Sequence, residues 1–199
     1  MRSVSVSSHK ETSERASRVK YFTESEIMQI LTVLHEEENR LLFQVGLELG
    51  ARVSEIAGLK WSDLQTTDKP YYVVLWDEKK DQHRVCTLPD NLWQLLREYR
   101  KKVDERKEKR IFPYSAKTLN RRIKSWAKDA GIARRVRWHD LRHTHVVRSR
   151  QKGRDWAAIS MQTGDTAATL ITTYSQLTVE DRQKISNEKP LIEGVEKHD

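Results

Sequence analysis

The stretch WHDLRHTHVVRSR carries a histidine and an arginine, His139 and Arg142, three residues apart. If a helix begins here, both side chains lie on one face of it. A guanidinium group offers two parallel donors to phosphate oxygens, and an imidazole can donate a hydrogen bond or move a proton near neutral pH. The pair therefore suits a phosphodiester.

The same stretch has a second interpretation as a metal site, because His139 and His143 form an H-x-x-x-H pattern. A zinc protease would place Glu directly after the first histidine, and here that position is Asp140. A third ligand is not evident in the sequence, and zinc sites use three or four protein ligands. We favour the phosphate and expect neither a metal nor another cofactor.

A second candidate pair is Arg52 and Glu55, three residues apart in LELGARVSEIAGL. The residues around them are apolar, so we expect both charges to be partly buried, and partly buried charges usually have a partner or a task. The alternative is a surface ion pair between neighbouring positions of one helical turn.

Two later features could be catalytic only if other reactive groups lie beside them. Lys79 and Lys80 lie in the polar turn DEKKDQH, where a lysine is usually just solvated, but an ammonium group above a phosphate can protonate a leaving oxygen. Tyr174, in LITTYSQL, is a possible nucleophile, although a lone tyrosine is more often a core or surface residue.

The positive charge of the chain is concentrated in one segment. The 199 residues carry a formal net charge of +8, whereas residues 121–154 alone carry +10. Such a segment suits a polyanion such as nucleic acid, and the alternative is a solvated basic surface. The candidate DNA-binding residues are Arg121, Arg122, Lys124, Arg134, Arg135 and Arg137.

Most of the remaining pattern is helical. Thr23 and Glu26 form a capping box before the first helix, Gly50 ends the second, and Asp155 can cap a short late helix. Alternating residues predict a β-hairpin. We predict helices at about 23–34, 41–50, 90–110, 118–130, 140–151, 155–161 and 178–190, a short helix that carries Tyr174, and the hairpin at 71–88.

Composition limits the protein class. The chain has one cysteine, Cys86, and the first residues lack an apolar signal segment, so we expect a cytoplasmic protein without a membrane anchor. Residues 1–20 have the composition of a flexible arm or linker.

In this order the elements resemble the catalytic domain of the tyrosine recombinases, the phage integrase family. GARVSEIAGLKWSDL is similar to the first arginine motif of that family, HDLRHTH to the second, and TGDTAATLITTY to the region of the nucleophile. The resemblance implies a mainly α fold with a small antiparallel β-sheet over residues 21–183. It also implies cleavage and rejoining of DNA without metal or ATP, and a tail at 184–199 that packs on a neighbouring protomer.

The resemblance assigns a role to each candidate. Tyr174 is the nucleophile that forms a 3′-phosphotyrosine, and the two arginines hold the phosphate oxygens. We prefer Lys79 to Lys80 as the general acid because Lys79 lies five residues before Arg84, the usual family offset from the start of the second strand. The remaining roles are proton transfer at the tyrosine for His139, phosphate binding for Arg52 and Arg142, and support of the arginines for Glu55.

One position departs from the family pattern. Nine residues before Tyr174 the family has His or Trp, which donates a hydrogen bond to the phosphate, and this chain has Asp165. An ionised carboxylate only accepts hydrogen bonds and would repel a phosphate. The site is then slow, uses another donor such as His143 or His145, or does not cleave at all.

The expected partner is double-stranded DNA. The resemblance implies a tetramer on DNA and is compatible with a monomer in its absence. The alternatives to a site-specific recombinase or integrase are a type IB topoisomerase and a DNA-binding relative without catalytic activity. The DNA site, the direction of recombination, the host element and a removed N-terminal domain are not encoded in these patterns.

Overall fold

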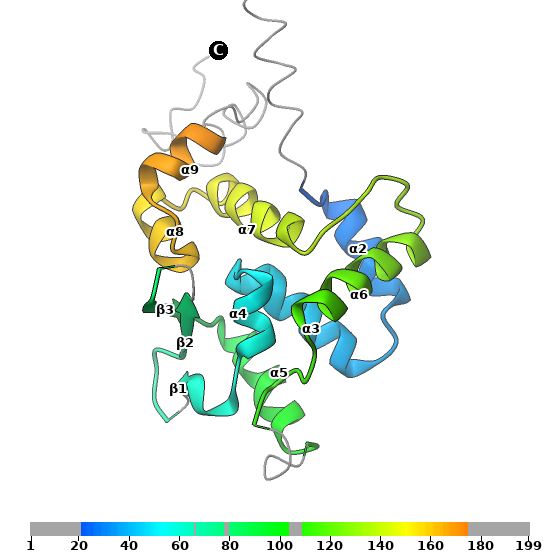
Figure 1. The fold of residues 1–199 in the computed structure, drawn as a ribbon, viewed down its shortest axis with the longest axis horizontal. Coiled ribbons are helices and arrows are strands. Elements are labelled where there is room, and N and C mark those ends of the chain that lie inside the picture. Colours follow the sequence, from blue (N-terminus) through cyan, green and yellow to red (C-terminus); the bar gives the residue numbers. More distant parts are fainter. Residues whose placement is uncertain (1–20, 66, 78–79, 104–108, 175–199) are drawn as a thin grey trace, which may run out of the picture.

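The structure, a computed structural model, describes residues 21–65, 67–77, 80–103 and 109–174. It is mainly helical with one small antiparallel sheet, as predicted (Figure 1). In chain order the elements are α2 (Glu24–Val33), α3 (Glu37–Leu49), α4 (Val53–Gly58), the short 3₁₀ helix η1 (Trp61–Asp63), β1 (Leu64–Gln65), β2 (Tyr72–Asp77), β3 (Gln82–Thr87), α5 (Asp90–Arg100), α6 (Ala116–Asp129), α7 (His139–Gln151), α8 (Trp156–Thr163) and α9 (Ala167–Tyr174).

The predicted helix ends are confirmed where a cap specifies them. The Thr23 hydroxyl accepts a hydrogen bond from the Glu26 amide, and the Glu26 carboxylate accepts one from the Thr23 amide. Gly50 ends α3 in the left-handed conformation, at φ 56°. Asp155 caps α8 by accepting from the Ala158 amide at 2.6 Å. Local hydrogen bonds therefore fix the starts of α2 and α8, and a left-handed glycine ends α3.

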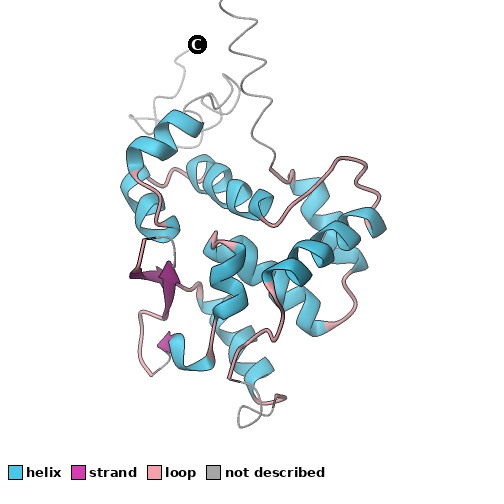
Figure 2. Cartoon of the chain, viewed as in Figure 1, coloured by secondary structure: helices cyan, strands magenta, loops and turns pink. Residues whose placement is uncertain are grey.

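The sheet holds the hairpin that the alternation predicted. Its strands run in the order β1-β2-β3, and β2 pairs with β3 in the register Val73 to Cys86 and Leu75 to Arg84. These four residues are buried, whereas most of their neighbours in the strands are not. The Cys86 thiol donates to the Gln162 carbonyl of α8 at 3.1 Å, so α8 is attached to β3. Figure 2 shows the sheet at one side of a largely helical molecule.

Helix α7 is central to the packing. It lies between α3 and the α8–α9 pair (Figure 1). The side chains of Trp138, just before α7, and Leu141, in its first turn, pack against Gly46 of α3. Thr144 is also fully buried, and its hydroxyl accepts a hydrogen bond from the Phe22 amide at 2.8 Å. The positive segment 121–154 is therefore only partly a surface, since one of its helices crosses the core.

Some elements differ from the prediction. Helix α3 begins at Glu37, four residues before the predicted start. The helix expected at 90–110 ends at Arg100, and Arg110 instead pairs with Lys60 in an isolated β-bridge. Charged residues continue the helical composition beyond Arg100, so composition did not reveal the end. Strand β1 has only two residues, and it was not predicted because so short a segment has no measurable alternation.

Other predictions fall outside the described residues. These are the arm at 1–20, the final helix at 178–190 and the tail at 184–199. Within the part of the chain that the structure describes, every helix is too short or too polar to cross a membrane.

Candidate active site

Arg142 lies in the first turn of α7 and is only 1% exposed. Its Nη1 atom donates to the Gly50 carbonyl at 2.8 Å. Because Gly50 is the C-cap of α3, the end of this helix binds the guanidinium group of Arg142 from α7. A buried guanidinium group also needs an anionic partner, since its desolvation costs several kcal/mol.

Arg52 precedes α4, and its backbone amide donates to the Glu55 carboxylate. Its guanidinium group contacts two other carboxylates from distant parts of the chain. Nη1 pairs with Asp77, which is buried at the end of β2, and Nη2 donates to Asp165 Oδ1 at 3.1 Å. Asp77 was not predicted as part of the site. Its inward position at a strand end is the sequence signal that could have indicated it.

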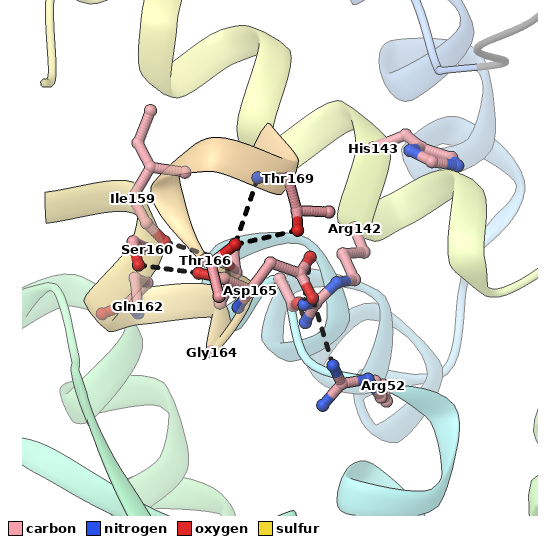
Figure 3. Close-up of polar contacts among 12 residues, drawn as sticks. Arg52, Arg142, His143, Ile159, Ser160, Gln162, Gly164, Asp165, Thr166 and Thr169 are labelled. Carbon is pink, nitrogen blue, oxygen red and sulfur yellow. Dashed lines mark hydrogen bonds and ion pairs between the residues drawn. The ribbon is translucent and has the colours of Figure 1, made fainter. Parts of the chain in front are cut away.

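Asp165 joins the two arginines. Its Oδ1 atom accepts from Arg52, and its Oδ2 atom lies 2.5 Å from Nη2 of Arg142 (Figure 3). Burial alone would raise the pKa of Asp165, but the charge and hydrogen bonding of Arg142, with the charge of Arg52, hold the pKa below its usual value. One carboxylate therefore occupies the space between two guanidinium groups that come from α4 and α7.

Glu55 forms a buried ion pair beside the two arginines. Both of its carboxylate oxygens accept from Arg84 of β3, one at 2.9 Å, and Arg52 Nη1 lies 3.5 Å from the same carboxylate. The Glu55 side chain is 1% exposed and that of Arg84 is 8% exposed. The predicted burial of Glu55 is confirmed, and its main partner is Arg84. An arginine at an inward position of an alternating strand is the signal that sequence reasoning missed.

Two glycines allow the chain to pass close to these residues. A Cβ atom on Gly164 would lie 2.9 Å from Cδ of Arg84, and one on Gly50 would lie 2.8 Å from the His145 ring. Both glycines have positive φ angles, 76° and 56°, which side chains rarely adopt. Gly164 precedes Asp165, so this close packing on Arg84 sets where the carboxylate lies.

Tyr174 ends α9 and is buried, at 7% exposed. Its hydroxyl forms a short hydrogen bond with Nδ1 of His143 in α7. Burial raises the pKa of Tyr174; the positive charge of Arg142 lowers the pKa and the negative charge of Asp165 raises it. The hydroxyl is therefore close enough to Arg142 and Asp165 to be affected by their charges, and it is protonated at neutral pH.

His139 lies beside His143 on the same face of α7, as the helical spacing predicts. Their ring centroids are 4.4 Å apart and the rings meet edge to face. The His139 side chain is exposed on one side, and burial on the other, followed by the charge of Arg142, lowers its pKa. In the described part of the chain, the histidine that contacts the Tyr174 hydroxyl is thus His143 rather than His139.

The hairpin lysines are only partly described. Lys79 lies outside the described residues. Lys80 is exposed, and its Nζ atom contacts the Gly164 carbonyl, next to Asp165. Strand β3 begins at Gln82, two residues before Arg84, so the strand start that favoured Lys79 over Lys80 was wrong.

The six candidate DNA-binding residues divide into two groups. Arg122 stacks on the Tyr114 ring at 3.8 Å and pairs with Asn39, while Arg134 pairs with Glu26 and Asp140. These two have intramolecular roles. The exposed members are Arg121, Lys124, Arg135 and Arg137.

The metal alternative gains no support from the geometry. Among the residues that the structure describes, no group of three or more His, Cys, Asp or Glu side chains could hold a metal ion. His143, one of the two suggested ligands, has its Nδ1 atom on the Tyr174 hydroxyl.

Comparison with known proteins identifies the family. The phage integrase family matches residues 20–180 of this chain, which is most of its length. The chain belongs to the phage integrase family. Curated relatives of this integrase-family chain include the tyrosine recombinase XerA of Thermococcus onnurineus, 29% identical over 88% of this chain and 64% of that protein. A tyrosine recombinase of Thermosipho africanus is 28% identical over 86% of this chain and 61% of that protein. The chain therefore spans less than two thirds of the length of these relatives.

Solved structures of the family have the same fold. The crystal structure of XerA recombinase matches with a TM-score of 0.71, at 23% identity, over 84% of this chain and 64% of that chain. The catalytic domain of the bacteriophage HP1 integrase matches with a TM-score of 0.63, at 19% identity, over 87% of this chain and 97% of that domain. The XerH site-specific recombinase, bound to a difH substrate after cleavage, matches at 0.67 and 19% identity over 85% of this chain and 52% of that chain. The fold is thus that of a tyrosine recombinase catalytic domain.

Proposed function

We propose that this chain is the catalytic domain of a site-specific DNA recombinase or integrase. It cleaves and rejoins DNA strands through a 3′-phosphotyrosine on Tyr174, without metal or ATP. The family match and the fold support recombination in general, and the arrangement of charged side chains supports this particular chemistry.

The observation that carries the proposal is the convergence of Arg52 and Arg142 on one carboxylate. Their Nη2 atoms lie 3.1 Å and 2.5 Å from the two oxygens of Asp165. A phosphodiester also presents two non-bridging oxygens with one negative charge, so it fits between the same guanidinium groups. The two arginines would bind it more strongly as negative charge builds in the transition state.

The proposed reaction exchanges one ester for another. The Tyr174 oxygen attacks phosphorus in line, the new oxygen–phosphorus bond forms, and the bond to the 5′-oxygen breaks. The tyrosine proton leaves to a base, and the 5′-oxygen gains a proton from an acid on the hairpin, for which Lys79 and Lys80 are the candidates. The phosphotyrosine retains the energy of the broken bond, so a 5′-hydroxyl from another strand reverses the step without ATP.

Asp165 has a double consequence for this site. It keeps the arginines together in the free protein, and it competes with DNA for the same two groups. The phosphate binds only after the carboxylate turns away, because Arg142 is otherwise almost fully buried. This competition is also the observation that favours a second candidate function, a DNA-binding relative that does not cleave.

The proposed partners are double-stranded DNA and further copies of the chain. The basic, exposed side chains of Arg121, Lys124, Arg135 and Arg137 are proposed to contact the DNA backbone. XerH has been seen on its difH substrate, and lambda integrase as a tetramer on a Holliday junction, which supports a DNA-bound tetramer by similarity. A cytoplasmic, DNA-associated location fits these partners.

A duplex nicked close to the cleavage site tests the proposal, because loss of the short product traps the cleaved state. We expect a covalent protein–DNA complex with the native chain and none with Tyr174→Phe, while both bind DNA equally. Binding without an adduct in either protein would support the non-cleaving relative. Relaxation of a supercoiled plasmid that lacks any recombination site would support the topoisomerase alternative.

A further inference from the structure

Asp77 is the last residue of β2, just before the turn that carries the hairpin lysines. Its side chain is 2% exposed and faces inward, as do Val73 and Leu75 of the same strand. A carboxylate at such a position is costly unless a cation pairs with it. That cation is Arg52, whose Nη1 atom donates to Asp77 Oδ2 at 2.5 Å. An ion pair therefore joins the end of β2 to the arginine that precedes α4.

The turn that follows Asp77 is attached to the same group of residues. The Asp77 carbonyl accepts a hydrogen bond from the Lys80 amide at 3.1 Å. The Nζ atom of Lys80 contacts the carbonyl of Gly164, the residue before Asp165. Asp165 in turn accepts from Nη2 of Arg52 at 3.1 Å. These contacts form a closed loop that links the lysine-bearing turn to the proposed phosphate position.

The two carboxylates occupy different nitrogen atoms of Arg52. Asp77 takes Nη1 and Asp165 takes Nη2, and the arginine side chain is 24% exposed. A phosphate that replaces Asp165 therefore leaves the Asp77 contact in place. Burial raises the pKa of Asp77, but the hydrogen bond and charge of Arg52 lower it, and the result is below the usual value, so the carboxylate is ionised at neutral pH.

We infer that Asp77 is a positioning residue, which holds the lysine-bearing turn against Arg52 so that a hairpin lysine reaches the leaving 5′-oxygen. The inference rests on the proposed strand-cleavage function. In that proposal Arg52 binds a non-bridging oxygen, and the leaving oxygen belongs to the same phosphate. A fixed distance from Arg52 to the turn therefore sets the distance from the acid to the oxygen that it protonates. Asp77 acts only through Arg52 and the turn.

The test compares Asp77→Asn with the native chain on the nicked duplex at saturating protein. The amide has the same shape and can still accept from Arg52, but it lacks the charge that holds the pair together. We expect cleavage to fall by about 10-fold to 100-fold. Asp81→Asn is the matched control and should cleave at the native rate, because Asp81 is exposed in the same turn and its positive φ angle of 52° is one that Asn tolerates.

A second substrate separates the positioning role from a purely structural one. With sulfur in place of the bridging 5′-oxygen, the leaving group departs as a thiolate and needs no acid. The Asp77→Asn variant should then cleave near the native rate, as should a Lys79→Ala, Lys80→Ala double variant. Arg142→Lys should stay defective, because the phosphate still has to be bound. A persistent Asp77→Asn defect on the sulfur substrate would overturn the inference, since Asp77 would then serve only the arginine or the fold.

Hydrogen exchange of the Lys80 amide in the DNA-free protein gives a check that does not need cleavage. We expect about tenfold faster exchange in Asp77→Asn and in Arg52→Ala, because each removes one half of the ion pair that holds the turn. Asp81→Asn should exchange at the native rate. Equal exchange in all of these proteins would show that the ion pair does not hold the turn, and would overturn the inference.

Failure of the inference is distinguishable from failure of the proposed function. If the native chain forms no adduct, the function is overturned, and the role of Asp77 in cleavage with it. If the native chain cleaves and Asp77→Asn cleaves equally fast on the oxygen substrate, only the positioning role is overturned.

Discussion

Replacing Asp165 with Asn should lower the stability of the folded protein and strengthen its binding to DNA. The carboxylate pairs with Arg142, whose side chain is 2% exposed, and with Arg52, whose side chain is 24% exposed. Loss of one partner from a fully buried pair costs about 3–5 kcal/mol. The Asp165 side chain is 25% exposed and Arg52 keeps Asp77, so we expect a smaller loss of about 2 kcal/mol, below the range for a fully buried pair.

The same substitution removes the anion that competes with a phosphate. An amide leaves both guanidinium groups without that charge, and we expect DNA affinity at fixed salt to rise about tenfold, which corresponds to about 1.4 kcal/mol. Thermal unfolding measures the first effect, and a loss of about 2 kcal/mol corresponds to a shift of about 4–8 °C for a domain of this size. Fluorescence anisotropy with a labelled duplex measures the second.

Acid unfolding adds a check with a defined sign. The pKa of Asp165 is below its ordinary value of 3.8 in the folded protein, so its contribution to stability is present above that pH and is lost as the pH falls through the lowered pKa. The Asp165→Asn variant should therefore lose less stability on acidification. Asp155→Asn is the matched control, since Asn also caps α8 well. A variant with native stability, or with weaker DNA binding, would refute the competition.

Three further predictions concern the scaffold of the site. Glu55→Gln should lower the free energy of unfolding in urea by about 3 kcal/mol because it leaves Arg84 buried without its charge partner, and a Glu55→Gln, Arg84→Met double variant that loses more than the single one would contradict this. Burial raises the pKa of Cys86 to about 11, so a thiol reagent at pH 8 should label it only after unfolding; labelling of the native protein within minutes would show that α8 leaves β3. Thr23→Ala should cost about 1 kcal/mol in thermal unfolding through loss of the capping box on α2, whereas Thr23→Ser should be nearly neutral.

Local signals in the sequence predicted much of the fold. Thr23 and Asp155 mark helix starts because each side chain accepts a hydrogen bond from an amide three residues on, and Gly50 marks a helix end because it adopts the left-handed conformation. Alternation predicted the β2–β3 hairpin because successive side chains of a strand point to opposite faces, and the inward ones are buried. The end of α5 at Arg100 was missed because the charged residues that follow it have the same helical composition.

The sequence predicted several residues of the site, but it did not predict how they contact one another. Arg52, Arg142 and Asp165 were each identified along the chain, but the sequence does not indicate that the carboxylate lies between the two arginines. From the sequence we expected Asp165 to repel a phosphate. The structure makes this expectation more specific, because the carboxylate lies where the phosphate would bind. That contact depends on how the α8–α9 connection crosses Arg84, through the close packing of Gly164.

The sequence also could not show which of two histidines contacts the Tyr174 hydroxyl. His139 and His143 are four residues apart and share one face of α7, so spacing alone treats them as equivalent. The approach of α9 breaks this equivalence, because it brings the Tyr174 hydroxyl to Nδ1 of His143.

The central claim is that DNA becomes attached to Tyr174, and peptide mass spectrometry of the trapped complex tests it most directly. Trypsin releases residues 155–182 as one peptide, and Tyr174 is its only tyrosine. After nuclease trimming we expect this peptide to carry a nucleotide through a 3′-phosphate, with fragment ions that place it on Tyr174. A nucleotide on any other residue, or an unmodified peptide from a complex that retains radiolabelled DNA, would contradict the account.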